Sequence, residues 1–495
     1  MKHSYFDNSH LKYRLKKLSI LGGMITSANQ GLLFFIRLSS IFILARILTP
    51  SDFGLIGMVT SLTVLIERFQ DFGLGDAIVQ TKNINQEQVS TLFWINIFVC
   101  ILLSIFVCLS SKAIAWFYAE ERLVAITSVL SLNFIFSGLA IQHQALIRRQ
   151  MRFDLFAIIQ TVSILLSVIV AVVLALKGFS YWALVFKELA RSIFNFILAW
   201  FFCSWRPGKP VRGSGVKSFL KFGYNVTGFN LLHFFSNNFD TVLIGKFIGA
   251  TSLGLYSRAK QLTTIPVSQL LEPIRYISFP ALGTLQNDPE KYKDYFIKML
   301  GIIAFFYMPI IVYMINFPHQ IILIALGQQW IDAVPLFTIL ALSMFFSPIV
   351  TLLGLNLLSI GYTRRYLFWG IFNSITISLS FAIGIKWGTV GISIAWPIAT
   401  TINLFFSLCY VFKNTPLDIK CILQALYRPF IASIATGFIL KFMHTFFIQF
   451  QLIFCLINSL IFGITTYLLL WLLFPGGYKQ IYKYFSYPLS IFKNK

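Results

Sequence analysis

The segment LFAIIQTVSILLSVIVAVVLAL, residues 155–176, decides the fold class because it carries no charged side chain over a length that can cross a bilayer. A transmembrane α-helix needs about 20 mostly apolar residues. Similar apolar stretches recur along the whole chain, and we predict about fourteen spans in all. Their approximate ranges are 24–48, 53–72, 88–110, 123–145, 155–176, 180–202, 219–240, 253–282, 295–317, 334–358, 366–385, 389–412, 423–442 and 452–474.

The composition of the chain agrees with an integral membrane protein. Of its 495 residues, 57% are hydrophobic, only 12% are charged, and 53 are Phe. The mean hydropathy is +0.77, which excludes an ordinary soluble globular domain. The first span is full length and has no small-residue cleavage site, so we expect it to be retained as an anchor.

Lys and Arg are distributed unevenly between the predicted loops. If the N-terminus is cytoplasmic, the cytoplasmic segments contain 26 Lys and Arg, whereas the opposite loops contain 7. Positive residues concentrate on the cytoplasmic side of membrane proteins. We therefore expect a multi-pass protein with both termini in the cytoplasm. Contact with anionic membrane lipids accounts for much of the net charge of +23, so no nucleic-acid partner is needed.

An internal repeat relates the two halves of the chain. With a shift of 200 residues, LARILTPSDFGL (residues 44–55) aligns with IGKFIGATSLGL (residues 244–255), which pairs Arg46 with Lys246 and Gly54 with Gly254. Six spans separate the two copies, so both copies have the same orientation in the membrane. Parallel repeats are an architecture of transporters, in which the substrate path lies between two lobes.

The fold class that we predict is an all-α membrane protein with two six-helix lobes related by a parallel repeat, followed by two C-terminal helices. The expected domains are a cytoplasmic N-terminal segment (1–20), an N-lobe (21–205), a basic cytoplasmic linker (206–220), a C-lobe (221–413), two further spans (414–475) and a cytoplasmic tail (476–495).

Several motifs, in this order and spacing, carry a family resemblance. They are ILARILTPSDFGL (43–55), FGLGDAIVQ (72–80), DTVLIGKFIG (240–249), LGLYSRA (253–259) and FPAL (279–282). Together they resemble the bacterial polysaccharide flippases of the Wzx type, and most closely the branch of colanic-acid and teichuronic-acid exporters within the multidrug/oligosaccharidyl-lipid/polysaccharide exporter (MOP) superfamily. The resemblance covers nearly the whole chain.

This resemblance implies a transporter and not an enzyme. Such a protein moves undecaprenyl-diphosphate-linked oligosaccharide repeat units from the cytoplasmic to the outer leaflet of the bacterial inner membrane, by alternating access, for the synthesis of surface polysaccharide or lipopolysaccharide. Its expected partners are the lipid-linked oligosaccharide, membrane lipids, a polysaccharide polymerase and glycosyltransferases.

A diphosphate cargo needs buried cations, and charged groups at membrane depth usually serve function. The predicted spans hold seven basic and four acidic residues, so their net charge is positive. The candidates for diphosphate contact are Arg37, Arg258, Lys260, Arg68, Arg191 and Arg275.

Two groups of these basic residues differ in their sequence neighbours. Arg68, Arg191 and Arg275 each have an acidic residue three positions away, so ordinary ion pairs on one helical face are the alternative for them. Arg37, Arg258 and Lys260 have no acidic neighbour within a turn of their own helix. We expect these three to face a shared cavity.

Polar side chains supply weaker candidates. Sugar hydroxyls could meet Gln30, Asn225, Asn230 and Asn237, although hydrogen bonds between helices are an equal alternative. Glu67, Asp71 and Glu272 are candidates for coupling to a Na⁺ or H⁺ gradient. We expect no other cofactor, no metal site and no catalytic residue.

Two other function classes stay open. A multidrug or cation antiporter of the same fold would need an acidic interior, against which the excess of Arg and Lys argues. A membrane polysaccharide polymerase or ligase would need a long external loop, and the longest external candidate, 316–332, is short and partly apolar.

Overall fold

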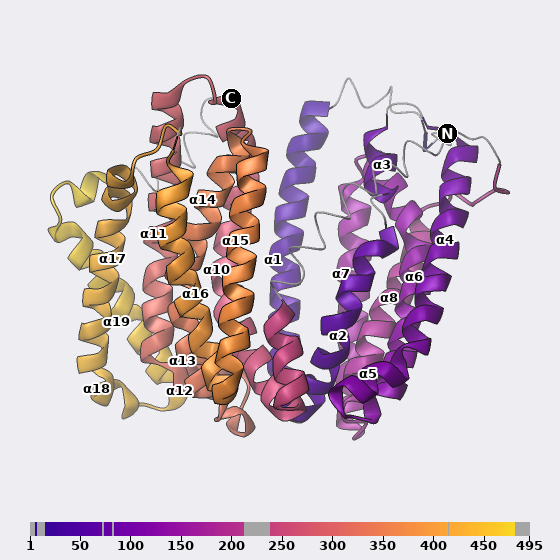
Figure 1. Cartoon of the computed structure of the whole chain (residues 1–495), viewed down its shortest axis with the longest axis horizontal. Helices are drawn as coiled ribbons and strands as arrows, with labels where there is room; N and C mark the ends of the chain where they lie inside the picture. The colour runs from indigo at the N-terminus through magenta and orange to yellow at the C-terminus, as the bar shows by residue number, and fades with distance from the viewer. Residues whose placement is uncertain are drawn as a thin grey trace. The chain divides into compact units, whose positions relative to one another are not determined.

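The computed structural model describes residues 5–6, 15–71, 74–81, 84–211, 238–413 and 415–480. All regular secondary structure in these ranges is helical, which confirms the all-α fold class (Figure 1). The chain divides into two compact units, Met1–Gly254 and Leu255–Lys495. Nine stretches of the described helices are long and apolar enough to cross a membrane, and two of them, Ala333–Ser359 and Thr363–Tyr410, each contain two α-helices. The total of fourteen spans and the domain boundaries stay predictions.

The first unit is a bundle of long helices with two short ones between them (Figure 1). Within the bundle α7 packs against α1 and α8, and α6 packs against α4 and α8. The short helices α3 and α5, which the sequence did not predict, both pack against α6. The helices are α1 (Leu15–Ile47), α2 (Pro50–Asp71), α3 (Leu74–Gln80), α4 (Gln86–Leu109), α5 (Ser111–Tyr118), α6 (Arg122–Arg149), α7 (Phe153–Leu176) and α8 (Trp182–Phe202), followed by the helix 238–247 and the first turn of α10 (Ala250–Thr284).

The chain that leaves α8 runs along α4. The Trp94 indole N–H donates to the carbonyl of Gly208 over 2.8 Å, and the Gly208 N–H donates to the Ser90 hydroxyl over 2.9 Å. The Val211 N–H donates to the Thr91 hydroxyl over 3.1 Å. Residues 206–211 of the predicted basic linker are therefore held against a spanning helix, and the remainder of the linker lies outside the described residues.

The second unit is built around α11, whose side chains Tyr292, Phe296, Leu300 and Tyr307 are almost fully buried. In this unit α11 packs against α17, α15 against α16, and α17 against α19. Its helices after α10 are α11 (Pro289–Asn316), α12 (Pro318–Ala325), α13 (Ala333–Ser343), α14 (Ser347–Ser359), α15 (Thr363–Gly384), α16 (Gly388–Val411), α17 (Ile419–Phe442), α18 (His444–Ile448) and α19 (Leu452–Leu473), with short 3₁₀ turns at Gln328–Trp330 and Ile385–Trp387.

One predicted span is divided in the structure. The range 334–358 contains two helices, α13 and α14, separated by a turn at residues 344–346. Pro348 lies in the first turn of α14, where its missing N–H costs no hydrogen bond, whereas in a continuous helix it would leave the carbonyl of Met344 without its donor. The stretch Ala333–Ser359 is thus one of the candidate spans, as expected over 334–358, but the sequence did not predict that two helices form it.

Helix α10 contains three prolines at a regular interval. Pro266, Pro273 and Pro280 lie inside the helix, and a spacing of seven residues, about two turns, places all three on nearly the same face. Each proline withdraws the backbone donor from the carbonyl four residues earlier. We infer that α10 bends more readily than the other long helices.

Candidate functional site

Helices α2, α6 and α8 of the first unit line a polar cavity of about 560 Å³. Its lining includes side chains with hydroxyl, amide, carboxylate and guanidinium groups. The lining residues are Thr60, Val64 and Gln70 of α2, Asn133, Phe134 and Ser137 of α6, and Glu188, Arg191 and Ser192 of α8. We call this space the polar cavity.

The charged groups of the polar cavity are loosely paired. The carboxylate of Glu188 lies 3.6 Å from the Nζ of Lys187 and 3.6 Å from the guanidinium of Arg191, so the ion pair expected between Glu188 and Arg191 is present. Tight charge-assisted hydrogen bonds are shorter, about 2.7–2.9 Å. The Arg191 side chain keeps 56% of its surface exposed. Because the pair is long and partly exposed, Arg191 can exchange Glu188 for another anion.

A third cation belongs to the same group. Arg37 of α1 is exposed and interacts electrostatically with both Arg191 and Glu188. Among the described residues, the three basic side chains of Arg37, Lys187 and Arg191 therefore all interact with the Glu188 carboxylate. The structure thus brings together two of the basic residues that the sequence predicted for diphosphate contact.

The amides of the polar cavity were not predicted from the sequence. The Gln70 side chain donates to the carbonyl of Phe134 over 3.3 Å. The Oδ1 atom of Asn133 is buried and accepts no hydrogen bond among the described residues. The signal that could have revealed them is the spacing of Asn133 and Ser137, which places both on one face of α6 beside Phe134.

Other predicted residues of the first unit lie elsewhere. Gln30 is exposed on α1, whereas its neighbour Asn29 accepts a hydrogen bond from the hydroxyl of Thr161 over 2.5 Å and so ties α1 to α7. Two sets of predicted residues lie outside the described residues. They are the side chains of Glu67, Arg68 and Asp71, near the end of α2, and the whole of Asn225, Asn230 and Asn237.

In the second unit Lys260 has an aromatic partner. Its Nζ lies 4.6 Å from the centre of the Trp396 ring on α16 and 6.0 Å from that of Tyr256, both within the range of a cation–π interaction. Arg258, two residues earlier on α10, is half-buried. That Arg37 shares one cavity with Arg258 and Lys260 stays a prediction, since these residues belong to different units.

A second charged pair lines a smaller cavity of about 340 Å³ between α10 and α14. The Arg275 guanidinium donates to the Glu272 carboxylate over 2.9 Å, so the expected ion pair is present here as well. This pair is shorter than that of Glu188 and Arg191, and Phe279 and Pro280 of the same helix lie beside it. Within the second unit Arg275 is therefore more fully neutralised than Arg191 is in the first.

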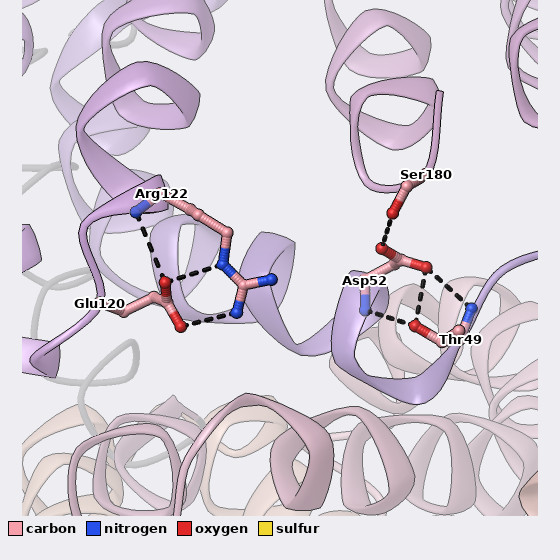
Figure 2. Close-up of polar contacts among 5 residues, drawn as sticks. All are labelled: Thr49, Asp52, Glu120, Arg122 and Ser180. Carbon is pink, nitrogen blue, oxygen red and sulfur yellow. Dashed lines mark hydrogen bonds and ion pairs between the residues drawn. The ribbon is translucent and has the colours of Figure 1, made fainter. Parts of the chain in front are cut away.

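A buried carboxylate fixes the start of α2 (Figure 2). The backbone N–H and the hydroxyl of Thr49 each donate to Asp52 over 2.8 Å, and the hydroxyl of Ser180, in the turn before α8, also donates to Asp52. Nearby, Arg122 makes two hydrogen bonds of 2.8 Å to Glu120, and these lower the pKa of Glu120. The TPSD segment of the repeat motif is thus a helix start that is tied to a second helix.

Comparisons with known proteins agree with this architecture. Residues 43–335 match the family model described as polysaccharide biosynthesis protein. The chain is 27% identical over 432 residues to the teichuronic acid biosynthesis protein TuaB of Bacillus subtilis (strain 168), covering 86% of this chain and 89% of TuaB. It is 23% identical to the lipopolysaccharide biosynthesis protein WzxC of Escherichia coli (strain K12), covering 86% of each chain.

The fold is also similar to that of a solved membrane protein. The lipid II flippase MurJ, in its inward closed conformation, superposes with a TM-score of 0.71 at 16% identity, covering 91% of this chain and 98% of MurJ. At that identity the likeness concerns the fold alone. Because the family model matches more than half of its length, this chain belongs to the family of polysaccharide biosynthesis proteins.

Proposed function

We propose that this protein is a flippase that moves undecaprenyl-diphosphate-linked oligosaccharide repeat units across the bacterial inner membrane, from the cytoplasmic to the outer leaflet, by alternating access. Its family, and relatives named for the biosynthesis of teichuronic acid and lipopolysaccharide, support a role in surface polysaccharide synthesis. The fold that it shares with a lipid II flippase supports a lipid-linked cargo. The protein acts as a carrier and catalyses no covalent step.

The observation that carries this proposal is the polar cavity, where Arg191 pairs loosely with Glu188. Among the described residues, Arg37 and Lys187 interact with the same carboxylate. A diphosphate is a multiply charged anion, and the guanidinium groups of Arg37 and Arg191 can each donate two parallel hydrogen bonds to phosphate oxygens. Glu188 holds Arg191 only at 3.6 Å, so an arriving phosphate can replace it. Gln70, Asn133 and the cavity hydroxyls then suit sugar hydroxyl groups, which both donate and accept hydrogen bonds.

Further parts of the proposal rest on the sequence. Both termini lie in the cytoplasm, as the charge of the loops indicates. Arg258, Lys260, Arg68 and Arg275 are additional sites of phosphate contact, and Glu67, Asp71 and Glu272 couple transport to a Na⁺ or H⁺ gradient. The polymerase and the glycosyltransferases of the same pathway are the protein's functional partners.

The test is a deletion strain complemented with variants of this chain. Without the protein, lipid-linked oligosaccharide should accumulate in the inner membrane and surface polysaccharide should be lost, and the wild-type chain should reverse both. Arg37→Ala and Arg191→Ala should each fail to restore polysaccharide while the protein reaches the membrane in normal amount. Arg364→Ala, which removes an exposed arginine outside the polar cavity, is the matched control.

A conservative substitution tests whether export needs only the charge of Arg191 or also the planar shape of its guanidinium. Arg191→Lys keeps the charge and removes the planar fork, so it should restore export only in part if two-pronged phosphate binding is needed. A deletion strain that makes normal polysaccharide and accumulates no lipid-linked intermediate would refute the flippase proposal.

A further inference from the structure

Another cavity of the first unit is formed by α5 and the start of α6. Its volume is about 560 Å³, within the range of about 300–1,000 Å³ that is usual for pockets of small organic ligands. We call this space the end pocket. The lining residues are Lys112, Ala115 and Trp116 of α5, Ala119, Glu120 and Glu121 of the following turn, and Val124 of α6.

The turn after α5 brings the polar groups of the end pocket together. Ala119 has a left-handed backbone conformation (φ 55°, ψ 43°) and ends α5. Its N–H donates to the carbonyl of Trp116 over 3.3 Å, and the N–H of Glu120 donates to the carbonyl of Ala115 over 3.0 Å. These two bonds form a Schellman motif, which turns the chain at the end of a helix. The carboxylates of Glu120 and Glu121 therefore line the same pocket as Trp116.

Trp116 provides the end pocket with an open aromatic ring. It is 82% exposed, whereas Ile114 and Tyr118 of the same short helix are buried. The Nζ of Lys246 lies 6.0 Å from the centre of the Trp116 ring, at the limit of a cation–π interaction. The face of an indole ring is negative and attracts C–H groups, and its edge carries an N–H that donates hydrogen bonds. The ring is thus available to stack on a ligand.

The charged groups of the end pocket differ in how firmly they are held. Arg122 makes two hydrogen bonds of 2.8 Å to Glu120 (Figure 2), so this carboxylate is fixed in place. Glu121 precedes α6, and its side chain makes no hydrogen bond to cap that helix. Within the part of the chain that the structure describes, neither Glu121 nor Lys112 forms an ion pair. One carboxylate and one ammonium are therefore available to a ligand.

This combination of groups matches the two sides of a sugar ring. A pyranose has C–H groups on its face and hydroxyl groups around its edge. The face can stack on the indole of Trp116, while hydroxyls donate to the carboxylate of Glu121 and accept from the ammonium of Lys112. Two of the three charged side chains in the lining are carboxylates, and like charges placed together disfavour a diphosphate. The end pocket therefore suits sugars, whereas the polar cavity suits phosphate.

We propose that the end pocket binds the oligosaccharide part of the cargo, with Trp116 stacked on a sugar ring and Glu121 and Lys112 bound to its hydroxyl groups. The inference rests on the proposed flippase function, which supplies the oligosaccharide. In the proposed orientation α5 joins two spans on the extracytoplasmic side. The site thus holds the sugars on the side where the cargo is released.

The binding test uses the purified full-length chain in nanodiscs, labelled with fluorotryptophan. Trp116→Phe identifies the fluorine NMR resonance of Trp116 among those of the ten tryptophans. The probe is the free oligosaccharide that mild acid releases from the lipid-linked oligosaccharide of the source strain. It should shift the Trp116 resonance in a saturable manner. Glu121→Ala should weaken this binding several-fold, and it removes no capping bond from α6.

Two controls separate the end pocket from the polar cavity. Inorganic pyrophosphate should leave the Trp116 resonance unmoved, because the carboxylates disfavour it. The oligosaccharide should shift the resonance equally in an Arg191→Ala protein, because the end pocket does not need Arg191. A shift with pyrophosphate, or one that is lost in Arg191→Ala, would overturn the proposal. So would a resonance that the oligosaccharide does not move, as expected of a tryptophan that only anchors the chain at the membrane surface.

Export in the deletion strain provides a second measurement. Trp116→Ala and Glu121→Ala should each lower export several-fold while the protein reaches the membrane in normal amount. The matched control is Trp387→Ala, since Trp387 is 68% exposed, ends a 3₁₀ turn and has no acidic residue between positions 380 and 395. It should export like the wild type. Normal export by both test variants, or an equal loss in Trp387→Ala, would overturn the sugar site, whereas complementation by the wild-type chain shows that the flippase function stands.

Discussion

At the scale of single residues, Asp52 is a buried carboxylate that depends on hydrogen bonds from neighbouring residues. Its side chain is 5% exposed and accepts hydrogen bonds from Thr49 and Ser180. Asp52→Asn replaces one acceptor oxygen with a donor, so at least one of these donors loses its partner, at a cost of about 1–3 kcal/mol. We expect a lower thermal unfolding midpoint for the purified protein in detergent.

The control for Asp52 is a carboxylate without such partners. Asp332 precedes α13, is exposed, and makes no side-chain hydrogen bond to cap that helix. Asp332→Asn should leave the midpoint within experimental error of the wild type. An equal shift for both variants would mean that the hydrogen bonds of Asp52 do not account for its contribution to stability.

Residues of the candidate site were predictable only where the sequence pattern that indicates them lies within a single helix. Charge at membrane depth identified Arg37 and Arg191, and the spacing of three residues identified the ion pair of Glu188 with Arg191. The aromatic partner of Lys260 could not be found in this way, because Trp396 lies in another helix far along the chain. The amide of Asn133 was missed because an isolated polar residue in a span has no distinctive pattern.

At the scale of elements, we expect the prolines of α10 to lower the stability of the protein and to let this helix bend. Pro273→Ala restores a backbone donor to the carbonyl of residue 269, and proline in a helix interior costs about 3 kcal/mol relative to alanine. We therefore expect a higher unfolding midpoint together with several-fold slower export in the complementation assay. Pro273 is exposed, so the substitution leaves no buried cavity.

Pro289 provides the comparison for this experiment. It lies in the first turn of α11, where a missing N–H removes no helical hydrogen bond. Pro289→Ala should change neither the midpoint nor export. Unchanged export by Pro273→Ala would show that transport does not need the bend.

The positions of the long helices were predictable, and the details of several were not. Apolar length alone located α4, α6, α7 and α19 to within a few residues, because a bilayer requires a minimum hydrophobic length. The expected span 295–317 missed the first six residues of α11. The break between α13 and α14 was missed because both halves are apolar and only Pro348 marks their boundary. The helix α5 was missed because eight residues are too few for a span.

At the scale of the whole molecule, the orientation in the membrane follows from charge and can be tested on one helix. Helix α11 has 28 residues, about 42 Å at 1.5 Å per residue, so its two ends should lie on opposite sides of a hydrocarbon core of about 30 Å. Cysteine at Gln329, beyond its C-terminal end, should react with a membrane-impermeant maleimide in intact cells. Cysteine at Lys291 should react only after permeabilisation, and the reverse pattern would invert the orientation.

The repeat predicted which residues are equivalent but could not predict that equivalent turns touch. A sequence shift relates positions in two copies and says nothing about the distance between them, so the contact of Gly54 with Ala250 and of Gly254 with Pro50 emerged only from the structure.

This reciprocity limits which residues positions 54 and 254 can accept. Each glycine is required by a carbonyl of the other copy, so a codon change that adds a methyl group at position 54 cannot be relieved by any change of side chain at position 250, where the obstacle is backbone. The same holds for position 254 against position 50. Positions 54 and 254 should therefore each keep glycine whatever side chains stand at positions 250 and 50.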